Sequence, residues 1–396
     1  MNNDLTLIIM AGGGGDSPIE QAVAGACRAA ARDTIERAIE ADVASRILVV
    51  TDHAEWAETL AYLPVEIDLE PPPAPSPVSR ERAREEAAPF HFGRRLAGVI
   101  ERHGIHRAFY LGGGSAPLMD GHALRAVADT VRHDDGLIVT NNIYSSDWAA
   151  FAPAGVAVQH ANDLRSDNSL GWILSRQGGL AAHEWPRSAA TQFDLDTPTD
   201  LLIAGLPPRP DRSERPVRSI GPHLRAHIAR LGWEDTHVRE AAKVLVAPAK
   251  QVIIAGRVPQ STWAYLESKT LCWMRVFSEE RGMRASGRLS SGLVRSLLAD
   301  YAALVGLEQF FHEMGELADA MFLDSRVMMA ARGSWPSPAD RFYSDLRRPD
   351  DIADPFLREF TAATLDAPVP VVLGGHSLVS GGLLALIDRV TEQQSN

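Results

Sequence analysis

An apolar run that leads straight into four glycines is the feature that most constrains how this chain folds. LTLIIM, residues 5–10, is typical of a strand buried in a parallel sheet. Gly12, Gly13, Gly14 and Gly15 follow, and then an alanine-rich segment with helical spacing. A strand, a glycine-rich turn and a helix in this order can bind an anion, because backbone N–H groups and the helix N-terminus point at the ligand. The alternative is a tight turn without a ligand. The absence of GK[ST] excludes a Walker loop, and the spacing disfavours a dinucleotide fingerprint.

The rest of the first half alternates short buried strands with helices. Strands are predicted at residues 46–52, 65–70, 108–114 and 136–142, with helices between them. Residues 143–193 are less regular. This alternation predicts an α/β fold with a mostly parallel sheet and right-handed crossovers.

The length of 396 residues predicts two domains, at about 100 to 200 residues per domain. The proline-rich run at 207–218 is interpreted as a linker, which gives a first domain over 1–206 and a second over 219–396. The second domain is also predicted to be α/β, and its role stays open. Its predicted strands are the apolar runs KVLVAP, QVIIAG, AMFLDSRV and VPVVLGG.

The formal net charge of −12 argues against general affinity for nucleic acid or an anionic membrane, since both partners favour basic surfaces. No apolar run approaches the roughly 18 residues of a membrane span. Cys27 and Cys272 form neither a CxxC motif nor a disulfide framework. A cytoplasmic location is therefore expected.

A second motif, FDLDTPTDL, covers residues 193–201. Asp194 and Asp196 lie at i and i+2 on an extended segment, so both carboxylates could bind one divalent cation, predicted to be Mg²⁺. Thr197 is predicted to cap a helix that begins near Pro198, with Asp200 in its first turn. A capping turn without a metal is the alternative.

Together these stretches resemble the nucleotidyltransferases of the molybdenum-cofactor guanylyltransferase and phospholactate guanylyltransferase type. The resemblance covers roughly residues 5–205 and depends on the strand ending in AGG, the mid-chain LGGGSAPLM and the closing DLDTPTDL. It implies a Rossmann-like, GT-A-type sheet domain in which Ala11 and the glycine loop hold the triphosphate of an NTP. Acidic residues would bind magnesium, and a small phosphorylated or hydroxylated substrate would attack the α-phosphorus as pyrophosphate leaves.

Three charged groups of that family are absent from this sequence. Ser17 stands where the family has an arginine that contacts the phosphates, and Ser115 stands at its metal-binding aspartate. The family lysine is missing, with Arg28 as the nearby cation in its place. A catalytically degenerate nucleotide or metabolite sensor is therefore the alternative to a divergent nucleotidyltransferase. A nucleotide-sugar glycosyltransferase is a further alternative, because residues 194–196 spell DxD.

The resemblance also implies that polar residues of the irregular region contact the acceptor substrate. These residues are Asn141, Asn142, Asp167 and Asn168. For the last two, a helix N-cap before SLGWIL is the alternative.

A second anion site is a further candidate, in the second domain. Its residues are Gly374, Gly375 and His376 in the run GGHS, together with Arg281, Arg284 and Arg288. Structural roles for the glycines and histidine, and a solvated face for the arginines, are the alternatives. Four aspartates without metal-like spacing are interpreted as surface residues or ion-pair partners: Asp319, Asp324, Asp340 and Asp345.

Overall fold

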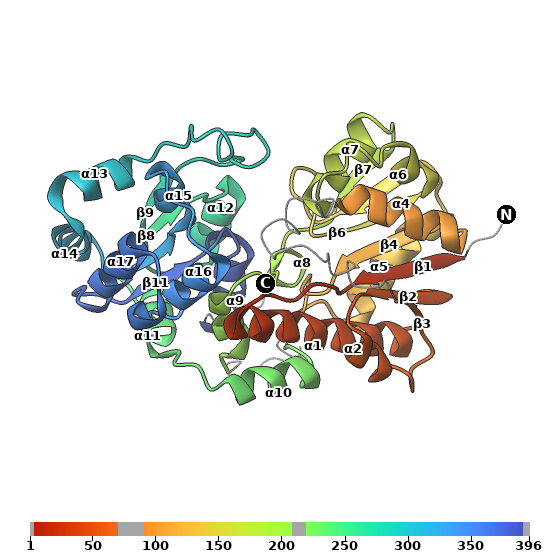
Figure 1. Ribbon diagram of the computed structural model, residues 1–396, viewed down its shortest axis with the longest axis horizontal. Helices are drawn as coiled ribbons and strands as arrows, with labels where there is room; N and C mark the ends of the chain where they lie inside the picture. The colour runs from red at the N-terminus through yellow and green to blue at the C-terminus, as the bar shows by residue number, and fades with distance from the viewer. Residues whose placement is uncertain (1–3, 70–90, 208–218, 391–396) are drawn as a thin grey trace, which may run out of the picture. The chain divides into compact units, whose positions relative to one another are not determined.

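The computed structural model describes residues 4–69, 91–207 and 219–390. The chain divides into two compact units (Figure 1). The first comprises Met1–Gly13 and Cys27–Arg187, and the second comprises Gly14–Ala26 and Ser188–Asn396. Nearly all of the predicted linker, residues 208–218, lies outside the described residues, and residues 188–206 group with the second unit.

The first unit contains a seven-stranded sheet with the order β3-β2-β1-β4-β6-β5-β7. Its strands are β1 (Leu5–Met10), β2 (Arg46–Thr51), β3 (Glu66–Leu69), β4 (Arg107–Gly112), β5 (Leu137–Thr140), β6 (Trp148–Ala152) and β7 (Ala181–Glu184). All neighbours pair in parallel except β6, which runs antiparallel to β4 and to β5. The predicted α/β class with a mostly parallel sheet is confirmed.

Helices cover both faces of this sheet because successive side chains of a strand point in opposite directions. Leu7 and Ile9 pack on the face covered by α1, α2 and α5, whereas Ile8 packs on the face covered by α4, α6 and α7 (Figure 1). The helices are α1 (Pro18–Glu40), α2 (Ala54–Glu58), α4 (Phe92–His103), α5 (Gly121–Arg132), α6 (Gly155–Gln159), the single turn η1 (Asp167–Ser169) and α7 (Leu170–Arg176). From Cys27 onward, α1 belongs to the first unit.

The region expected to be irregular, residues 143–193, contains regular elements. Strand β6, WAAFA, is fully buried, and it pairs on both sides. Five apolar residues are too few for their periodicity to separate a strand from a buried helix. This run forms a strand because it pairs with β4 and β5, which lie elsewhere in the sequence.

The second unit contains an entirely parallel sheet with the order β11-β10-β8-β9. Its strands are β8 (Gln251–Gly256), β9 (Trp273–Ser278), β10 (Ala320–Asp324) and β11 (Val371–Gly374). The strand predicted at KVLVAP is wrong, because this run overlaps helix α11 (Thr236–Leu245), whose buried Val238, Ala241, Ala242 and Leu245 follow helical spacing. The edge strand β9 was not predicted.

Phenylalanines from α14 and α17 form much of the core on one face of the second sheet. Phe310, Phe311 and Phe360 are buried there against side chains of β8, β10 and β11. The helices are α8 (Ala189–Gln192), α9 (Pro198–Gly205), α10 (Pro222–Leu231), α11, α12 (Gln260–Lys269), α13 (Leu297–Val305), α14 (Leu307–Leu317), α15 (Arg326–Ala331), α16 (Pro338–Asp345), α17 (Pro355–Leu365) and α18 (Leu383–Val390), with the short turns η2 (Pro349–Asp351) and η3 (Leu378–Gly382).

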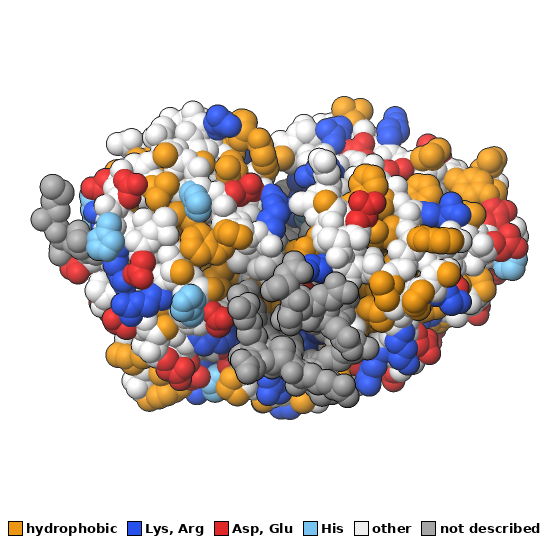
Figure 2. All heavy atoms as spheres, turned by 180° about the vertical axis from the view of Figure 1, so that it is seen from behind, with side chains coloured by type: hydrophobic (Ala, Val, Ile, Leu, Met, Phe, Trp, Pro, Cys, Tyr) orange, Lys and Arg blue, Asp and Glu red, His pale blue; other side chains and the backbone are white. Residues whose placement is uncertain are grey.

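Acidic and basic side chains are interspersed on the face of the molecule shown in Figure 2. None of the helices in the described ranges is both long and apolar enough to cross a bilayer. The expected lack of nucleic-acid affinity and the cytoplasmic location stay predictions.

Candidate functional site

The glycine loop follows β1 and is attached to the end of the neighbouring strand β2. The Ala11 N–H donates to the Val50 carbonyl at 3.0 Å, and Thr51 Oγ1 donates to the Ala11 carbonyl at 2.8 Å. Gly13 has a φ of +82°, a backbone conformation that residues other than glycine rarely adopt. Its N–H donates to Asp52 Oδ1 at 2.9 Å. The start of the loop is therefore fixed at the carboxyl edge of the sheet.

Asp52 and Arg28 are the charged side chains that contact this part of the loop. Arg28 Nη1 donates to the Gly13 carbonyl at 3.1 Å. Burial lowers the pKa of Arg28, and the nearby Cys27 and Asp52 act in the opposite direction. A Cβ atom on Gly12 would lie 3.1 Å from Asp52 Oδ1, so the carboxylate sits directly against the backbone. The sequence prediction included Arg28 but missed Asp52.

The sequence did carry a signal for Asp52. It directly follows the buried strand RILVVT, and parallel neighbours bring their carboxyl ends to the same edge of a sheet. A polar residue at the end of β2 was therefore a candidate neighbour of the residues at the end of β1.

Both serines at the altered family positions have structural partners. Ser17 Oγ donates to Glu20 Oε2 at 2.7 Å, which forms a capping interaction at the start of α1. Ser115 is buried, and its Oγ donates to the Asp147 carbonyl at 2.9 Å. Ser115 thus joins the loop after β4 to the start of β6. Their predicted nucleotide contacts stay predictions.

The four residues predicted to contact the acceptor lie in two loops that are hydrogen-bonded to each other. Ser145 Oγ, in the first loop, donates to Asn168 Oδ1 in the second at 2.8 Å. The fully buried Asn141 donates through Nδ2 to Asp147 Oδ2 at 2.6 Å. Asn142 Oδ1 accepts from the Tyr144 N–H at 3.0 Å.

Asp167 also has a partner in the first unit. Its Oδ2 accepts from the Tyr110 hydroxyl at 3.2 Å, and its Oδ1 accepts from the Asn168 N–H at 2.9 Å. The structure thus brings the four residues together, and most of their side-chain groups already have protein partners. Their acceptor role stays a prediction.

The DxD segment belongs to the second unit. Thr197 caps helix α9, with Asp200 in its first turn, as predicted. The two residues also form a capping box, in which Asp200 Oδ2 accepts from the Thr197 N–H at 2.8 Å. The Ser377 hydroxyl donates to the Asp194 carbonyl at 3.0 Å, which joins the segment to the loop after β11.

The surroundings of Asp196 are cationic. Arg284, Arg257 and Arg326 all act electrostatically on its exposed carboxylate. Mg²⁺ prefers oxygen ligands, and positively charged neighbours oppose its binding. The surroundings of Asp194 and Asp196 therefore fit an anion better than a resident Mg²⁺ ion.

The second sheet gathers charged residues at its carboxyl edge. Arg257 follows β8 and contacts Asp324, the last residue of β10, through Nε at 2.5 Å and Nη2 at 3.0 Å. Burial opposes ionisation of Asp324, but Arg257 outweighs it and holds the pKa of this carboxyl below its usual value. Gly256, at φ +113°, allows the approach, because a Cβ atom there would lie 2.5 Å from the Asp324 Cβ.

Arg326 opens helix α15 beside this pair. It contacts Asp345 twice, through Nη1 to Oδ1 at 2.5 Å and Nη2 to Oδ2 at 2.6 Å. Arg326 Nη1 also donates to the Gly374 carbonyl at 3.3 Å.

The four aspartates without metal-like spacing do not lie at the surface as a set. Asp324, Asp340 and Asp345 are buried. The interpretation as surface residues or ion-pair partners is wrong only for Asp340, which accepts backbone N–H groups instead. Asp324 and Asp345 pair with arginines, and Asp340 accepts the Ala353 N–H at 2.8 Å. Asp319 forms an ion pair with Lys250 at 2.7 Å.

The predicted second anion site is assembled only in part. Arg284 acts electrostatically on Arg257 and Arg326, and the charge of Arg281 acts on His376. Burial and the charge of Arg257 lower the pKa of His376 to about 4, so its imidazole is neutral at pH 7. Arg288 instead pairs with Glu280 at 2.8 Å.

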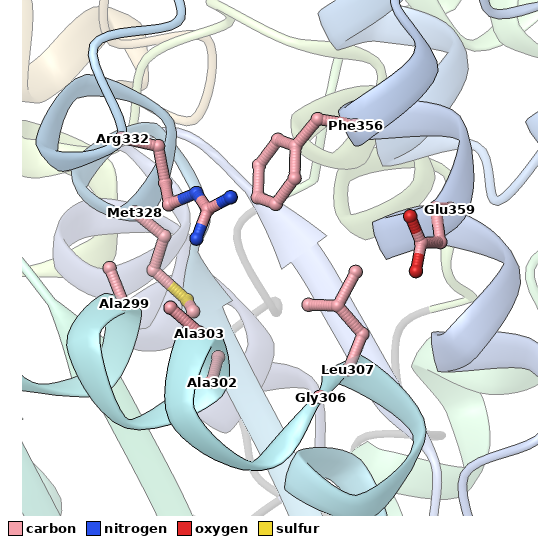
Figure 3. A pocket seen from close by; sticks show the side chains of 9 residues that line it. All are labelled: Ala299, Ala302, Ala303, Gly306, Leu307, Met328, Arg332, Phe356 and Glu359. Carbon is pink, nitrogen blue, oxygen red and sulfur yellow. The ribbon is translucent and has the colours of Figure 1, made fainter.

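A separate pocket of about 170 Å³ lies among the helices of the second unit (Figure 3). The Arg332 guanidinium lies 4.9 Å from the centre of the Phe356 ring, and the two side chains point toward each other. The pocket is lined by Ala299, Ala302, Ala303, Gly306, Leu307, Met328, Arg332, Phe356 and Glu359. It shares no residue with the charged edge of the sheet.

Comparison with known proteins gives matches among solved structures. No protein-family model and no curated protein matches the sequence. A cytidylyltransferase from Leptospira borgpetersenii matches at 13% identity and a TM-score of 0.37, over 50% of this chain and 84% of that one. A nucleotidyl transferase from Methanothermobacter thermautotroptrophicus matches at 14% identity and a TM-score of 0.37, over 58% of this chain and 100% of that one.

A 4-diphosphocytidyl-2C-methyl-D-erythritol synthase from Anaerococcus prevotii matches at 12% identity and a TM-score of 0.31, over 50% of this chain and 94% of that one. None of these three descriptions names the molybdenum-cofactor or phospholactate guanylyltransferase type, which stays a prediction.

Proposed function

We propose that this protein is a nucleotidyltransferase that binds an NTP through the glycine loop that follows β1. The observation that carries the proposal is the loop between β1 and α1, with Gly13 in a left-handed conformation and Arg28 against its carbonyl. This arrangement lies at the carboxyl edge of a mostly parallel sheet, where ligands of such folds bind. The sequence resemblance around the loop supports the same activity.

The proposed reaction is a displacement at the α-phosphorus. An oxygen of a small phosphorylated or hydroxylated metabolite forms a bond to that phosphorus, and the bond to the β-phosphate oxygen breaks, which releases pyrophosphate. The loop positions the phosphates, and Arg28 offsets part of their charge. Such catalysis needs orientation and charge neutralisation rather than a covalent enzyme intermediate.

Asp52, which follows β2 and contacts the glycine loop, is the residue that fits a magnesium ion accompanying the nucleotide. Mg²⁺ in nucleotide sites is commonly held by one or two carboxylates together with substrate phosphates. Asp52 supplies one carboxylate against the Gly13 backbone. The ion would offset the negative charge of the phosphates, which the Asp52 carboxylate alone would repel. The binding of an acceptor, of an NTP and of magnesium are all part of the proposal.

A sensor that binds nucleotide without turnover is the second candidate. It is favoured by the structural roles of Ser17 and Ser115, which replace two charged groups of the resembling family. Those groups would each contribute about 2.7 to 4 kcal/mol of transition-state stabilisation, by analogy with single oxyanion-hole donors. The glycosyltransferase alternative depended on the DxD segment, which lies in the second unit beside arginines.

Calorimetric titration with the four NTPs, with and without Mg²⁺, tests nucleotide binding, and a pyrophosphate-release assay with candidate acceptors tests turnover. Arg28→Gln should weaken NTP binding. Asp52→Asn should weaken it when Mg²⁺ is present and so reduce its dependence on Mg²⁺. Arg32→Gln is the matched control, because Arg32 lies on the same helix and contacts Glu36 and Tyr62. Binding without pyrophosphate release supports the sensor. Failure of every NTP to bind contradicts both candidates.

A further inference from the structure

Four arginines meet at the carboxyl edge of the second sheet, from four separate segments. Arg257 follows β8, Arg284 lies beyond β9, Arg326 begins α15 and Arg341 lies in α16. Their charges act on one another: Arg257 and Arg326 on Arg284, and Arg326 and Arg284 on Arg341. Like charges repel, so a fold that gathers them must supply anions.

Two of the four arginines are neutralised by the protein itself. Arg257 pairs with Asp324, and Arg326 pairs with Asp345 through two contacts. All of these contacts lie between 2.5 and 3.0 Å. Neither aspartate is therefore available to compensate a further cation.

Arg284 and Arg341 form no ion pair within the described ranges. Both lie against the same partly exposed indole, with the Arg284 guanidinium 5.7 Å and the Arg341 guanidinium 4.8 Å from the centre of the Trp335 ring. Of the acids that act on Arg341, Asp345 is already paired with Arg326, and Glu20 accepts a hydrogen bond from Ser17. Burial and neighbouring arginines lower the pKa of both Arg284 and Arg341.

The remaining positive charge fits one group with two negative charges better than a carboxylate, which carries a single charge. A phosphate monoester carries about −1.5 to −2 charges at pH 7 and three acceptor oxygens. The planar guanidinium fork matches a phosphate group through paired N–H donors. Asp196 is exposed beside Arg284, and its carboxylate can accept a hydroxyl hydrogen but repels a larger polyanion.

We propose that the second unit binds a small phosphorylated, hydroxyl-bearing metabolite at this edge, with its phosphate on Arg284 and Arg341 and a hydroxyl on Asp196. The ends of β8 and β10 and the first turn of α15 form the rigid base of the site, because Asp324 pairs in register with Gly374 and Arg326 donates to that glycine's carbonyl. The proposed ligand is a different molecule from the nucleotide proposed for the glycine loop.

Calorimetric titration of the full chain tests the proposal, with inorganic phosphate, ribose 5-phosphate and succinate as probes. Wild-type protein should bind the two phosphate compounds and not succinate. Arg284→Gln and Arg341→Gln should each weaken binding of both compounds at least tenfold, by loss of a charge-assisted contact. Arg288→Gln is the matched control and should bind as wild type, because Arg288 already pairs with Glu280. Melting temperatures check that each variant is folded.

Several results would overturn the proposal. Unchanged phosphate binding in folded Arg284→Gln and Arg341→Gln removes both arginines from the site. Loss of phosphate binding in Arg28→Gln, with Arg284→Gln unaffected, assigns the phosphate to the glycine loop. Binding of succinate alone identifies a dicarboxylate site, and failure of either phosphate compound to bind rejects the ligand class.

Discussion

The Arg326 guanidinium and the Asp345 carboxylate form a two-point ion pair inside the second unit. The contacts measure 2.5 and 2.6 Å, and the two side chains are only 6% and 0% exposed. Burial opposes the charge of Arg326, yet the Asp345 carboxylate outweighs it and raises the pKa of the guanidinium. The pair anchors the start of α15 to the end of α16.

Asp345→Asn should destabilise the protein strongly. The substitution leaves the Arg326 charge buried without a counter-ion, which costs about 3 to 5 kcal/mol of unfolding free energy. Urea unfolding measures this difference. Asp351→Asn is the control, since the Arg348–Asp351 pair is exposed and worth about 0 to 1 kcal/mol. A loss below 1 kcal/mol for Asp345→Asn would show that the buried pair is dispensable.

Gly13→Ala should weaken NTP binding, whereas Gly14→Ala should not. A Cβ atom at either position meets no atom within 4 Å, so crowding is the same for both. Only Gly13 has a positive φ, and the left-handed conformation costs other residues about 1 to 2 kcal/mol. An affinity loss of roughly tenfold is expected for Gly13→Ala in calorimetric titration. Equal affinities for the two variants would contradict a role for the loop conformation.

Gly256→Ala should cost more stability than Gly306→Ala. Both glycines have a positive φ, +113° and +88°, so both substitutions strain the backbone. At Gly256 the new Cβ would also lie 2.5 Å from the Asp324 Cβ, whereas at Gly306 it would meet nothing within 4 Å. We expect Gly306→Ala to lower the free energy of unfolding by about 1 to 2 kcal/mol, and Gly256→Ala to lower it by more. Thermal and urea unfolding of both variants check the order.

Stability should rise with pH between about 4 and 6.5, and His237 in α11 should contribute to this rise. Burial and the charge of Arg347 lower the pKa of this histidine to about 4, against an unperturbed value near 6.5. The unfolded chain therefore binds the extra proton in this window while the folded chain does not. Stability is lost as the pH falls, by up to about 3 kcal/mol.

Urea unfolding of His237→Gln at several pH values between 4 and 7.5 tests this assignment. The slope of stability against pH should decrease in the variant. His312→Gln is the control, because the His312 side chain is 61% exposed. An unchanged slope in His237→Gln would assign the pH dependence to other groups.

Local patterns in the sequence were enough to predict the strand, glycine turn and helix at the start of the chain. They also predicted the α/β class and Thr197 as the cap of helix α9, with Asp200 in its first turn. Each of these features depends on neighbours within a few residues, where hydrogen bonds and side-chain spacing act directly. The apolar pattern wrongly predicted a strand at KVLVAP and did not predict the strand at WAAFA. Short apolar runs suit either a buried helix or a strand.

The composition of both candidate sites was decided by the tertiary structure. Asp52 reaches Gly13 only because β1 and β2 are parallel neighbours with a shared carboxyl edge. In the second unit, sheet pairing and the start of α15 bring Asp196 close to arginines that lie 61 to 130 positions further along the chain. Charges separated this far in sequence leave no local pattern. Their interaction arises when packing of the apolar strands and helices fixes where each strand ends.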